Sequence, residues 1–527
     1  MTANNQINTA NPEAITYHTD ELGFTILGGI RLEGLDRMRV TIRTEVMNRK
    51  FQHYLNNPDI AGLPLHQSLD LYNDNQVEKL TRKAAEKLEV GSTAVAKALA
   101  EITQQLEKYR LQQIEASQPK AAAKKQLSDT EQKTTTAFLQ QADLLQRTNE
   151  LIGKSSIVGE ETNRLIMWLI FTSRLTNRPL HIISFGSSGT GKSHLQEKVG
   201  ELIPEEEVIE ITALTENAFY YFDKAALGHK LLLIEDLDGI WSALYPLREL
   251  QSKQRISKTI TIKDKNGNTK TVHLKVNGPV CIAGCTTKES IYEDNANRSF
   301  LIYLDESNQQ DDKVMEYQRK LSAGKVNSTD ETQARQLLQN VQRVLQPITV
   351  RNPYAELLQI PKEVFKQRRT NAHYLAFIEV ITFYKQHQRT QQVDKESGEL
   401  FIETTLEDIA EANQLMKDIL LRKSDELNGA TRNYFEQLKE YLQQSKQSSF
   451  TNTSIRNQLR IALSTVKRYH QTLQVAGYIR KIENQQTKAY YYEVVSYEEY
   501  KKLQSSISTA LDEALENVKK QQNKKKK

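Results

Sequence analysis

The length, composition and charge of the chain exclude several classes of protein. With 527 residues, of which 38% are hydrophobic and 26% charged, the composition predicts about two to four globular domains. The sequence has no apolar run long enough to span a bilayer and no signal-peptide pattern at residues 1–14, so we expect a cytoplasmic protein with no membrane contact. Cys281 and Cys285 are too few for a disulfide framework or a Cys₄ zinc site, and the net charge of +5 is less than the six lysines of the C-terminus supply.

Residues 1–115 predict a small α+β domain. We expect short strands at residues 15–19, 24–27 and 37–44, followed by helices at 74–88 and 92–114. Arg37, Arg39 and Arg43 should share one face of the third strand, which is either a solvated surface or a nucleic-acid contact. Residues 116–137 have no apolar periodicity and are expected to form a linker or an exposed helix.

A phosphate-binding loop dominates the next segment, residues 138–310. The loop follows the apolar run of residues 180–185, precedes helical spacing, and matches its motif completely with Gly186, Ser187, Ser188, Gly189, Thr190, Gly191, Lys192 and Ser193. The glycines let backbone N–H groups turn toward phosphate oxygens, Lys192 adds a charge for the β- and γ-phosphates, and Ser193 is placed to ligate Mg²⁺. We therefore expect a nucleoside triphosphate, ATP, and Mg²⁺ as cofactors.

Polar residues end two later strands of the same segment. The apolar residues 231–234 lead into Glu235 and Asp236, one carboxylate for the Mg²⁺ shell and one to orient the attacking water. The usual order of these acids is Asp then Glu, so which of the two holds the metal stays open. The strand at residues 279–287 ends in Thr286 and Thr287, whose hydroxyls are placed to reach the attacking water or the γ-phosphate.

Between these strands, two alternating runs around Asn266-Gly267 predict a β-hairpin. Its sides and tip carry lysines 258, 263, 265, 270 and 275, with Asp264 as the one acid. Such lysines suit contacts with nucleic-acid phosphates, and we single out Lys263, Lys265 and Lys270 as DNA contacts. The alternative is an edge hairpin whose lysines prevent strand pairing.

The order of these motifs resembles AAA+ ATPases with a hairpin ahead of the first sensor. Within that group, residues 235–238 and 297–302 are similar to the acidic strand and the Ser-Arg-Phe-Asp-Leu-Ile run of minichromosome-maintenance helicases, and residues 69–72 resemble the N-terminal segment of helicase modules of primases from bacterial mobile elements. The resemblance implies that Arg298 is an arginine finger for a neighbouring subunit, that Thr286 or Thr287 is the first sensor, and that Arg369 or Arg368 is the second. It also implies an α/β AAA+ P-loop core with a helical lid at residues 311–445, assembled as a homo-oligomer, a hexamer.

Residues 446–500 predict a winged helix. Helices at 453–459 and 464–473 form a helix-turn-helix pair, and strands at 478–482 and 489–495 flank a polar wing. On the second helix we expect residues 465, 467, 468, 470 and 471 to face away from Val466, Leu473 and Val475, as a groove-reading helix requires. Winged helices also contact proteins, so both roles stay open. Residues 501–527 predict a helix and a disordered basic tail.

Together these patterns favour an ATP-dependent DNA translocase or helicase that works as a ring in replication of DNA or of a mobile element. One alternative is an ATP switch that loads a helicase or directs a transposase without unwinding DNA, and another is a protein remodeller. The chain has no cysteine-rich zinc finger and no acidic polymerase-type constellation, so primer synthesis would come from a separate primase or polymerase.

Overall fold

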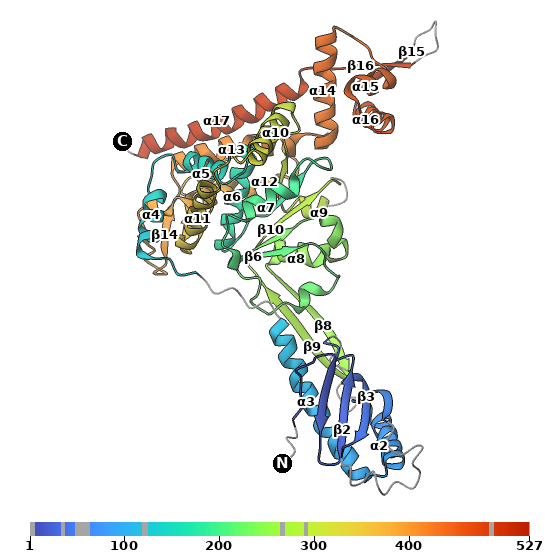
Figure 1. The fold of residues 1–527 in the computed structure, drawn as a ribbon. Helices are drawn as coiled ribbons and strands as arrows, with labels where there is room; N and C mark the ends of the chain where they lie inside the picture. The colour runs from blue at the N-terminus through green and yellow to red at the C-terminus, as the bar shows by residue number, and fades with distance from the viewer. Residues whose placement is uncertain are drawn as a thin grey trace. The chain divides into compact units, whose positions relative to one another are not determined.

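The chain forms two compact units, Met1–Ala123 and Lys124–Lys527, each with its own hydrophobic core (Figure 1). The computed structural model describes residues 6–32, 37–47, 64–117, 125–263, 269–288, 293–483 and 490–525. Within those residues, no helix combines the length and the apolar character needed to cross a membrane.

The N-terminal unit is a four-stranded antiparallel sheet with two helices packed on one face. The strands follow chain order, β1 (Ala14–His18), β2 (Leu22–Leu27), β3 (Arg39–Val46) and β4 (Leu65–Asp70), and the helices are α2 (Asp74–Leu88) and α3 (Ser92–Ser117). The sequence does not predict β4, because only its first residue and Leu69 are buried. On the outer face Arg39 is exposed and Arg43 pairs with Glu45 at 2.6 Å, whereas Arg37 precedes the strand.

A five-stranded parallel sheet is the centre of the second unit. Its strand order is β11-β5-β10-β7-β6, with bounds β5 (Ile182–Phe185), β6 (Val208–Ile211), β7 (Lys230–Ile234), β10 (Val280–Thr286) and β11 (Phe300–Tyr303). All pairings are parallel, so the carboxyl ends of the strands meet at one edge of the sheet. Strand β10 therefore separates β5, which precedes the loop, from β7, which precedes the paired acids.

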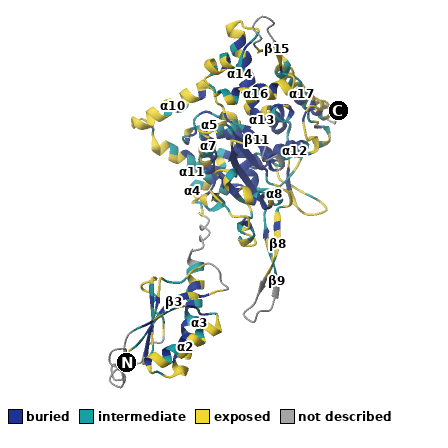
Figure 2. Ribbon diagram, turned by 90° about the vertical axis from the view of Figure 1, so that its right-hand side faces the viewer, coloured by how far each residue is buried: buried dark blue, intermediate teal, exposed yellow. Residues whose placement is uncertain are grey.

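The sheet is packed between two layers. Side chains alternate along each strand, so Leu231 and Leu232 belong to separate cores on opposite faces. One face is covered by helices including α6 (Glu161–Thr172) and α7 (Lys192–Gly200), and the other by α8 (Leu244–Lys253) with the 3-10 segments η3 (Ala218–Tyr221) and η4 (Leu237–Ala243). Figure 2 shows the buried sheet between these layers.

The hairpin predicted around Asn266-Gly267 is confirmed. Strands β8 (Arg255–Lys263) and β9 (Thr269–Asn277) pair antiparallel along their whole length, from Arg255 opposite Asn277 to Lys263 opposite Thr269. Ile256 and Val276 anchor its base in a core of the sheet, and the rest projects from that unit (Figure 2). The turn, with Lys265, lies outside the described residues, as do the side chains of Lys263 and Lys270.

Helices surround the sheet on the side where we expect a lid. They are α4 (Asp129–Leu139), α5 (Leu144–Lys154), α10 (Asn308–Ser322), α11 (Ser328–Val344), α12 (Gln367–Tyr384) and α13 (Leu406–Ser424). Helix α4 begins with a capping box of Ser128 and Glu131 and buries Thr135 and Leu139, so residues 129–137 of the expected linker are a packed helix. A small sheet of β12 (Thr349–Arg351), β13 (Gln392–Val393) and β14 (Leu400–Glu403) was not predicted.

The C-terminal part contains the two predicted helices and the two predicted strands. They are α15 (Asn452–Leu459), α16 (Leu463–Val475), β15 (Ile479–Glu483) and β16 (Tyr490–Val494), and they share a core with α14 (Gly429–Ser445). Two predicted orientations are wrong. His470 is 1% exposed, because α14 packs against its side of α16, and Val475, in the last turn, is 84% exposed. Helix α17 (Glu499–Lys525) also continues into the expected disordered tail.

Candidate functional site

The phosphate-binding loop joins β5 to α7 at the carboxyl edge of the sheet. Gly189 and Gly191 adopt φ values of 84° and 87°, in the left-handed region that favours glycine. A Cβ atom on Gly186 would lie 2.8 Å from Oγ1 of Thr190, so the first glycine is required for a close approach. Helix α7 begins at Lys192 and directs its free N–H groups toward the loop.

Lys192 lies across this loop. Its ammonium group donates to the carbonyl oxygens of Gly186 at 2.9 Å and Ser187 at 2.6 Å, and the side chain is 8% exposed. Both acceptors are uncharged, so the positive charge remains available to an anion in the loop. Thr190 closes the turn by donating from Oγ1 to the carbonyl oxygen of Ser187 at 2.9 Å.

Glu235 and Asp236 follow β7 beside this loop, and their side chains differ in freedom. Ser193 Oγ donates to the backbone oxygen of Glu235 at 3.4 Å. The Asp236 carboxylate accepts from the N–H of Asp238 at 2.9 Å and so caps η4. The Glu235 side chain is exposed and makes no hydrogen bond or ion pair within the described part of the chain. Asp236 is thus held in place, and Glu235 is free to turn toward a ligand.

Thr286 and Thr287 lie between the loop and the acids, because β10 lies between β5 and β7. Thr286 is 2% exposed and its hydroxyl accepts from the N–H of Lys288 at 3.0 Å. Thr287 is exposed. Lys288 in turn pairs with Asp238 at 3.0 Å, which links the end of β10 to the turn after the acids.

Two further residues of this edge were not predicted. Glu306, three residues after β11, accepts from the N–H of Ser187 at 2.8 Å. Gln196 donates to the carbonyl oxygen of Ile234 at 2.9 Å and accepts from the Cys285 thiol at 3.4 Å, which ties α7 to β7 and β10. Burial raises the pKa of this thiol to about 12, so the thiol keeps its proton. Glu306 follows strand β11 closely, and an acidic residue shortly after an apolar strand is the pattern that identified Glu235.

A cleft of about 1080 Å³ opens beside Glu306. Its walls include Glu160, Asn163, Tyr303 and Arg422. Glu160 is fixed by two donors, Nδ2 of Asn163 at 2.6 Å and the N–H of Asp305 at 2.8 Å. Arg422 lies 4.9 Å from the ring centroid of Tyr303. The cleft is large enough for the remainder of a nucleotide whose phosphates occupy the loop.

Arg298 lies at the opposite edge of the sheet. It precedes β11, whose first residue Phe300 pairs with Ile182, while the loop begins after Phe185, about 13 Å further along the strands. Its Nε donates to Oγ of Ser252 at the end of α8, at 2.6 Å. The Arg298 side chain therefore points away from the phosphate-binding loop of its own chain.

Arg369 also lies near this amino edge. It precedes by one turn His373, whose ring stacks on that of Phe300 with centroids 5.4 Å apart. Burial, and then the charge of Arg369, lower the pKa of Lys423 to about 8, and Lys423 lies 6.0 Å from the ring centroid of Phe300. The expected role of Arg369 as the second sensor stays a prediction.

The oxygen atoms at the carboxyl edge suit Mg²⁺. Ser193 offers a hydroxyl and Asp236 a carboxylate, and both are hard oxygen ligands. The two side chains lie near each other, because the Ser193 hydroxyl bonds to the backbone oxygen of Glu235, the residue before Asp236. Within the described residues, no group of three or more His, Cys, Asp and Glu side chains is arranged to hold a metal. A magnesium ion here would take its remaining ligands from phosphates and water, as is usual for this ion.

A comparison with protein families matches the part of the chain that contains this site. A family model described as the MTBMA_p00010 P-loop domain matches residues 129–347, and no curated protein matches. Similar solved structures include a full-length MCM homolog from Methanopyrus kandleri, with 13% identity, 57% of this chain and 63% of that chain covered, and a TM-score of 0.37. Drosophila ORC bound to DNA is 11% identical, with 77% of this chain and 99% of that chain covered and a TM-score of 0.24. The match spans less than two thirds of the MCM homolog. Residues 129–347 form an α/β P-loop domain.

Proposed function

We propose that this protein is an AAA+ ATPase that moves along or unwinds DNA during replication, as a ring of identical subunits. The observation that carries the proposal is the division of charged residues between the two edges of one sheet. The loop, the threonines and the acids share the carboxyl edge, whereas Arg298 lies at the amino edge. In a head-to-tail ring, such as a hexamer, the amino edge of one subunit faces the carboxyl edge of the next.

Each residue of the carboxyl edge has a proposed role in ATP hydrolysis. Residues 186–193 hold the phosphates, with Lys192 on the β- and γ-phosphates. Asp236 and Ser193 hold Mg²⁺, since the Asp236 carboxylate is already fixed as a cap. Glu235 is free to orient the attacking water, and Thr286 or Thr287 senses the γ-phosphate. When bound, Mg²⁺ would neutralise charge on the phosphate oxygens.

Arg298 completes the site of the neighbouring subunit. Its guanidinium would stabilise the negative charge that develops on the phosphoryl group during transfer. The Ser252 hydroxyl accepts a hydrogen bond from Nε of this side chain at 2.6 Å, which holds the arginine at the amino edge of the sheet. Arg369 would act as the second sensor in the same way, on the nucleotide of the neighbouring subunit.

DNA contact is proposed for two further elements. Strands β8 and β9 of the hairpin project from the P-loop unit (Figure 2), and contacts of the hairpin lysines with phosphates would shift along the backbone as each subunit hydrolyses ATP. The C-terminal helix pair and strand pair are a proposed winged helix, in which Lys467, Arg468 and Gln471 are exposed on α16. A separate primase or polymerase would supply primer synthesis.

ATP hydrolysis and strand displacement on a forked DNA duplex test this proposal. Lys192→Ala removes the charge on the phosphates and should reduce both activities at least about a hundredfold. The matched control is Lys198→Ala on the same helix, where the lysine pairs with Glu201 at 2.6 Å; it should keep both activities. DNA-stimulated hydrolysis without displacement would identify the protein as an ATP switch that loads another enzyme. Hydrolysis that persists in Lys192→Ala would remove the proposed site.

A further inference from the structure

Three aromatic rings are exposed near the base of the hairpin. Tyr221 on η3, Trp241 on η4 and Tyr245 on α8 are 66%, 57% and 58% exposed. Most other large apolar side chains with this exposure in the described part of the chain are aliphatic and scattered. Exposed rings that cluster add nothing to the core of their own unit, and such clusters mark binding surfaces.

Contacts place a basic side chain beside two rings of this region. Lys258 of β8 lies 5.5 Å from the ring centroid of Tyr220, and Arg248 lies 5.0 Å from that of Tyr245. Burial, and then the charge of Tyr245, raise the pKa of Tyr220, and η3 and α8 both pack against β8. Segment η3 also packs against both strands of the hairpin. We call this the aromatic surface, and it consists of residues 220, 221, 241 and 245 with Arg248 and Lys258.

The charge around the aromatic surface favours an anionic partner. Glu249 is its nearest carboxylate on α8 and pairs with Lys253 at 2.5 Å. Glu216 lies near Tyr220. On η4, Asp238 pairs with Lys288 at 3.0 Å. Against these acids stand Arg248, Lys258 and Lys253, and the sequences of β8 and β9 contain further lysines.

We propose that the aromatic surface stacks on the bases of single-stranded nucleic acid whose phosphates lie along the hairpin lysines. Unpaired bases expose flat faces that stack on aromatic rings without regard to sequence, and cations beside the rings strengthen the contact. The bases of a duplex are already stacked on one another, so a duplex gains nothing from these rings. This inference rests on the proposed action on DNA and adds the strand that the protein holds.

The aromatic surface is covalently joined to both parts of the proposed ATPase site. Segment η4 begins at the cap made by Asp236 and contains Trp241. Helix α8 follows directly, and its last turn carries Ser252, which holds Arg298. A strand stacked on Trp241 and Tyr245 therefore fixes the elements that position the acids and the arginine. Single-stranded DNA should accelerate ATP hydrolysis more than duplex DNA does.

Tryptophan fluorescence of the full-length protein tests the aromatic surface. The chain has two tryptophans, and Trp168 is fully buried, so a quencher at the surface acts on Trp241. Adding an oligothymidine strand should quench the tryptophan emission, and the concentration at half-maximal quenching should equal that at half-maximal binding. A blunt-ended DNA duplex should not quench the emission. Trp241→Ala and Tyr245→Ala should each weaken oligothymidine binding about tenfold, and Trp241→Phe should restore most of the affinity. The matched control is Phe365→Ala, because Phe365 is 50% exposed outside this surface.

The outcomes separate this inference from the proposed function. Tight oligothymidine binding with unchanged emission, and with unchanged affinity in both alanine variants, overturns the aromatic surface but leaves the proposed function intact. A wild-type protein that binds neither oligothymidine nor duplex overturns the proposed function itself. If the tryptophan emission changes with protein concentration in the absence of DNA, these rings lie in a contact between subunits, and the inference is also overturned.

Discussion

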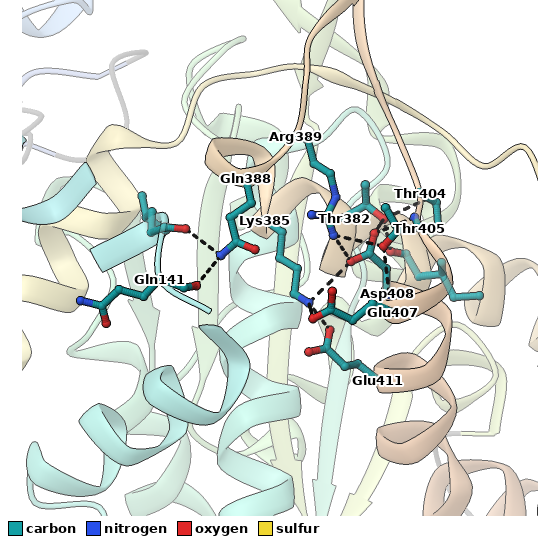
Figure 3. Close-up of polar contacts among 12 residues, drawn as sticks. Gln141, Thr382, Lys385, Gln388, Arg389, Thr404, Thr405, Glu407, Asp408 and Glu411 are labelled. Atoms are coloured by element: carbon teal, nitrogen blue, oxygen red, sulfur yellow. Dashed lines mark hydrogen bonds and ion pairs between the residues drawn. The ribbon is translucent and has the colours of Figure 1, made fainter. Parts of the chain in front are cut away.

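The P-loop edge and the end of the lid both carry clusters of charged residues, but the two clusters differ in how far their charged side chains are buried and paired. In the lid, Lys385 and Asp408 are 1% and 0% exposed and are surrounded by partners (Figure 3). At the P-loop edge, Glu235 is exposed and has no partner within the described residues. Buried charges must be paired to remain in a fold, whereas unpaired exposed charges are available to a ligand. The cluster in the lid therefore stabilises the fold, whereas the cluster at the P-loop edge has a side chain available to bind a ligand.

The lid cluster joins three helices and a loop. Asp408 accepts from the N–H of Thr405 at 2.9 Å, which caps α13, and pairs with Arg389 at 2.5 Å. Gln388 donates to the carbonyl oxygens of Leu139 and Gln141 at 2.9 and 2.7 Å, and so connects the end of α12 to α4 (Figure 3). The charged side chains Lys385, Arg389 and Asp408 each have an ion-pair partner there, so their charges are already compensated.

The largest expected effect comes from replacing Arg298, which lies at the amino edge of the sheet that carries the phosphate-binding loop. Arg298→Ala should lower the rate of ATP hydrolysis about 10³-fold or more and leave nucleotide binding intact. Stability should not change, because the side chain is partly exposed. Single-turnover hydrolysis and binding of a fluorescent nucleotide measure the two effects, and Arg319→Ala on the exposed side of α10 is the control. Full turnover in Arg298→Ala would remove the arginine from the site.

Mixed assemblies test whether Arg298 acts on the neighbour. When Arg298→Ala and Lys192→Ala subunits are mixed equally, roughly a quarter of the interfaces in a random ring combine an intact loop with an intact arginine. Hydrolysis should then reappear, although each variant alone is inactive. No recovery in rings shown to contain both variants would mean that both residues serve the same chain's site.

The next effect concerns the buried charges of the lid. Asp408→Ala leaves Arg389 without its buried partner and Thr405 without its cap, and should destabilise the lid by about 3–5 kcal/mol. Glu407→Ala is the matched control, because Glu407 also pairs with Lys385 but is 62% exposed, and should cost less than about 1 kcal/mol. Urea unfolding measures both. Equal losses would show that burial does not distinguish these two carboxylates.

A smaller effect depends on pH. His470 donates from Nδ1 to Oδ1 of Asn452 and accepts from the Tyr434 hydroxyl at Nε2, both at 2.5 Å, and burial lowers its pKa to about 4. Since the unfolded chain takes up this proton first, the stability gained from the neutral ring is complete above about pH 6.5 and is lost as pH falls toward 4, by up to about 3 kcal/mol.

Hydrogen exchange of the α16 amides at pH 7 and pH 4.5 measures this loss. His470→Asn keeps a donor and an acceptor without titrating, so its exchange should depend less on pH in this window. A His470 ring that titrates at its ordinary pKa in an NMR experiment would contradict the buried, neutral ring.

The smallest effect concerns three lysines of the hairpin. Replacing Lys263, Lys265 and Lys270 with glutamine should lower the slope of log affinity against log salt by about 2 on single-stranded DNA. Glutamine at Lys417, Lys501 and Lys502, on helices outside the hairpin, is the matched control. An unchanged slope would leave these three lysines with the role of preventing edge pairing.

The parts of the site that follow local rules could be predicted from sequence. The loop, the paired acids and the hairpin each depend on a short motif or on alternation within one segment, and each lies in the structure where the sequence placed it along the chain. Strand β4 and the strands of the lid sheet were missed, because a strand of two to six residues with few buried positions carries little periodicity.

Other features depend on which elements become neighbours. Glu306 meets Ser187 only because β11 pairs with β5, and that strand order is not visible in the sequence. His470 is buried because α14 covers its side of α16, while helical spacing alone predicted the opposite. The position of Arg369 likewise follows from the packing of α12 against Phe300.

Strand β11 is four residues long, and in the proposed ring its two ends would belong to different active sites. Arg298 just before it serves the next subunit in the proposed ring, and Glu306 just after it holds the first N–H group of the loop in its own subunit. A strand this short and this buried moves as a rigid piece. Neighbouring subunits should therefore hydrolyse ATP in a coordinated order, and the rate should rise with ATP concentration with a Hill coefficient above one.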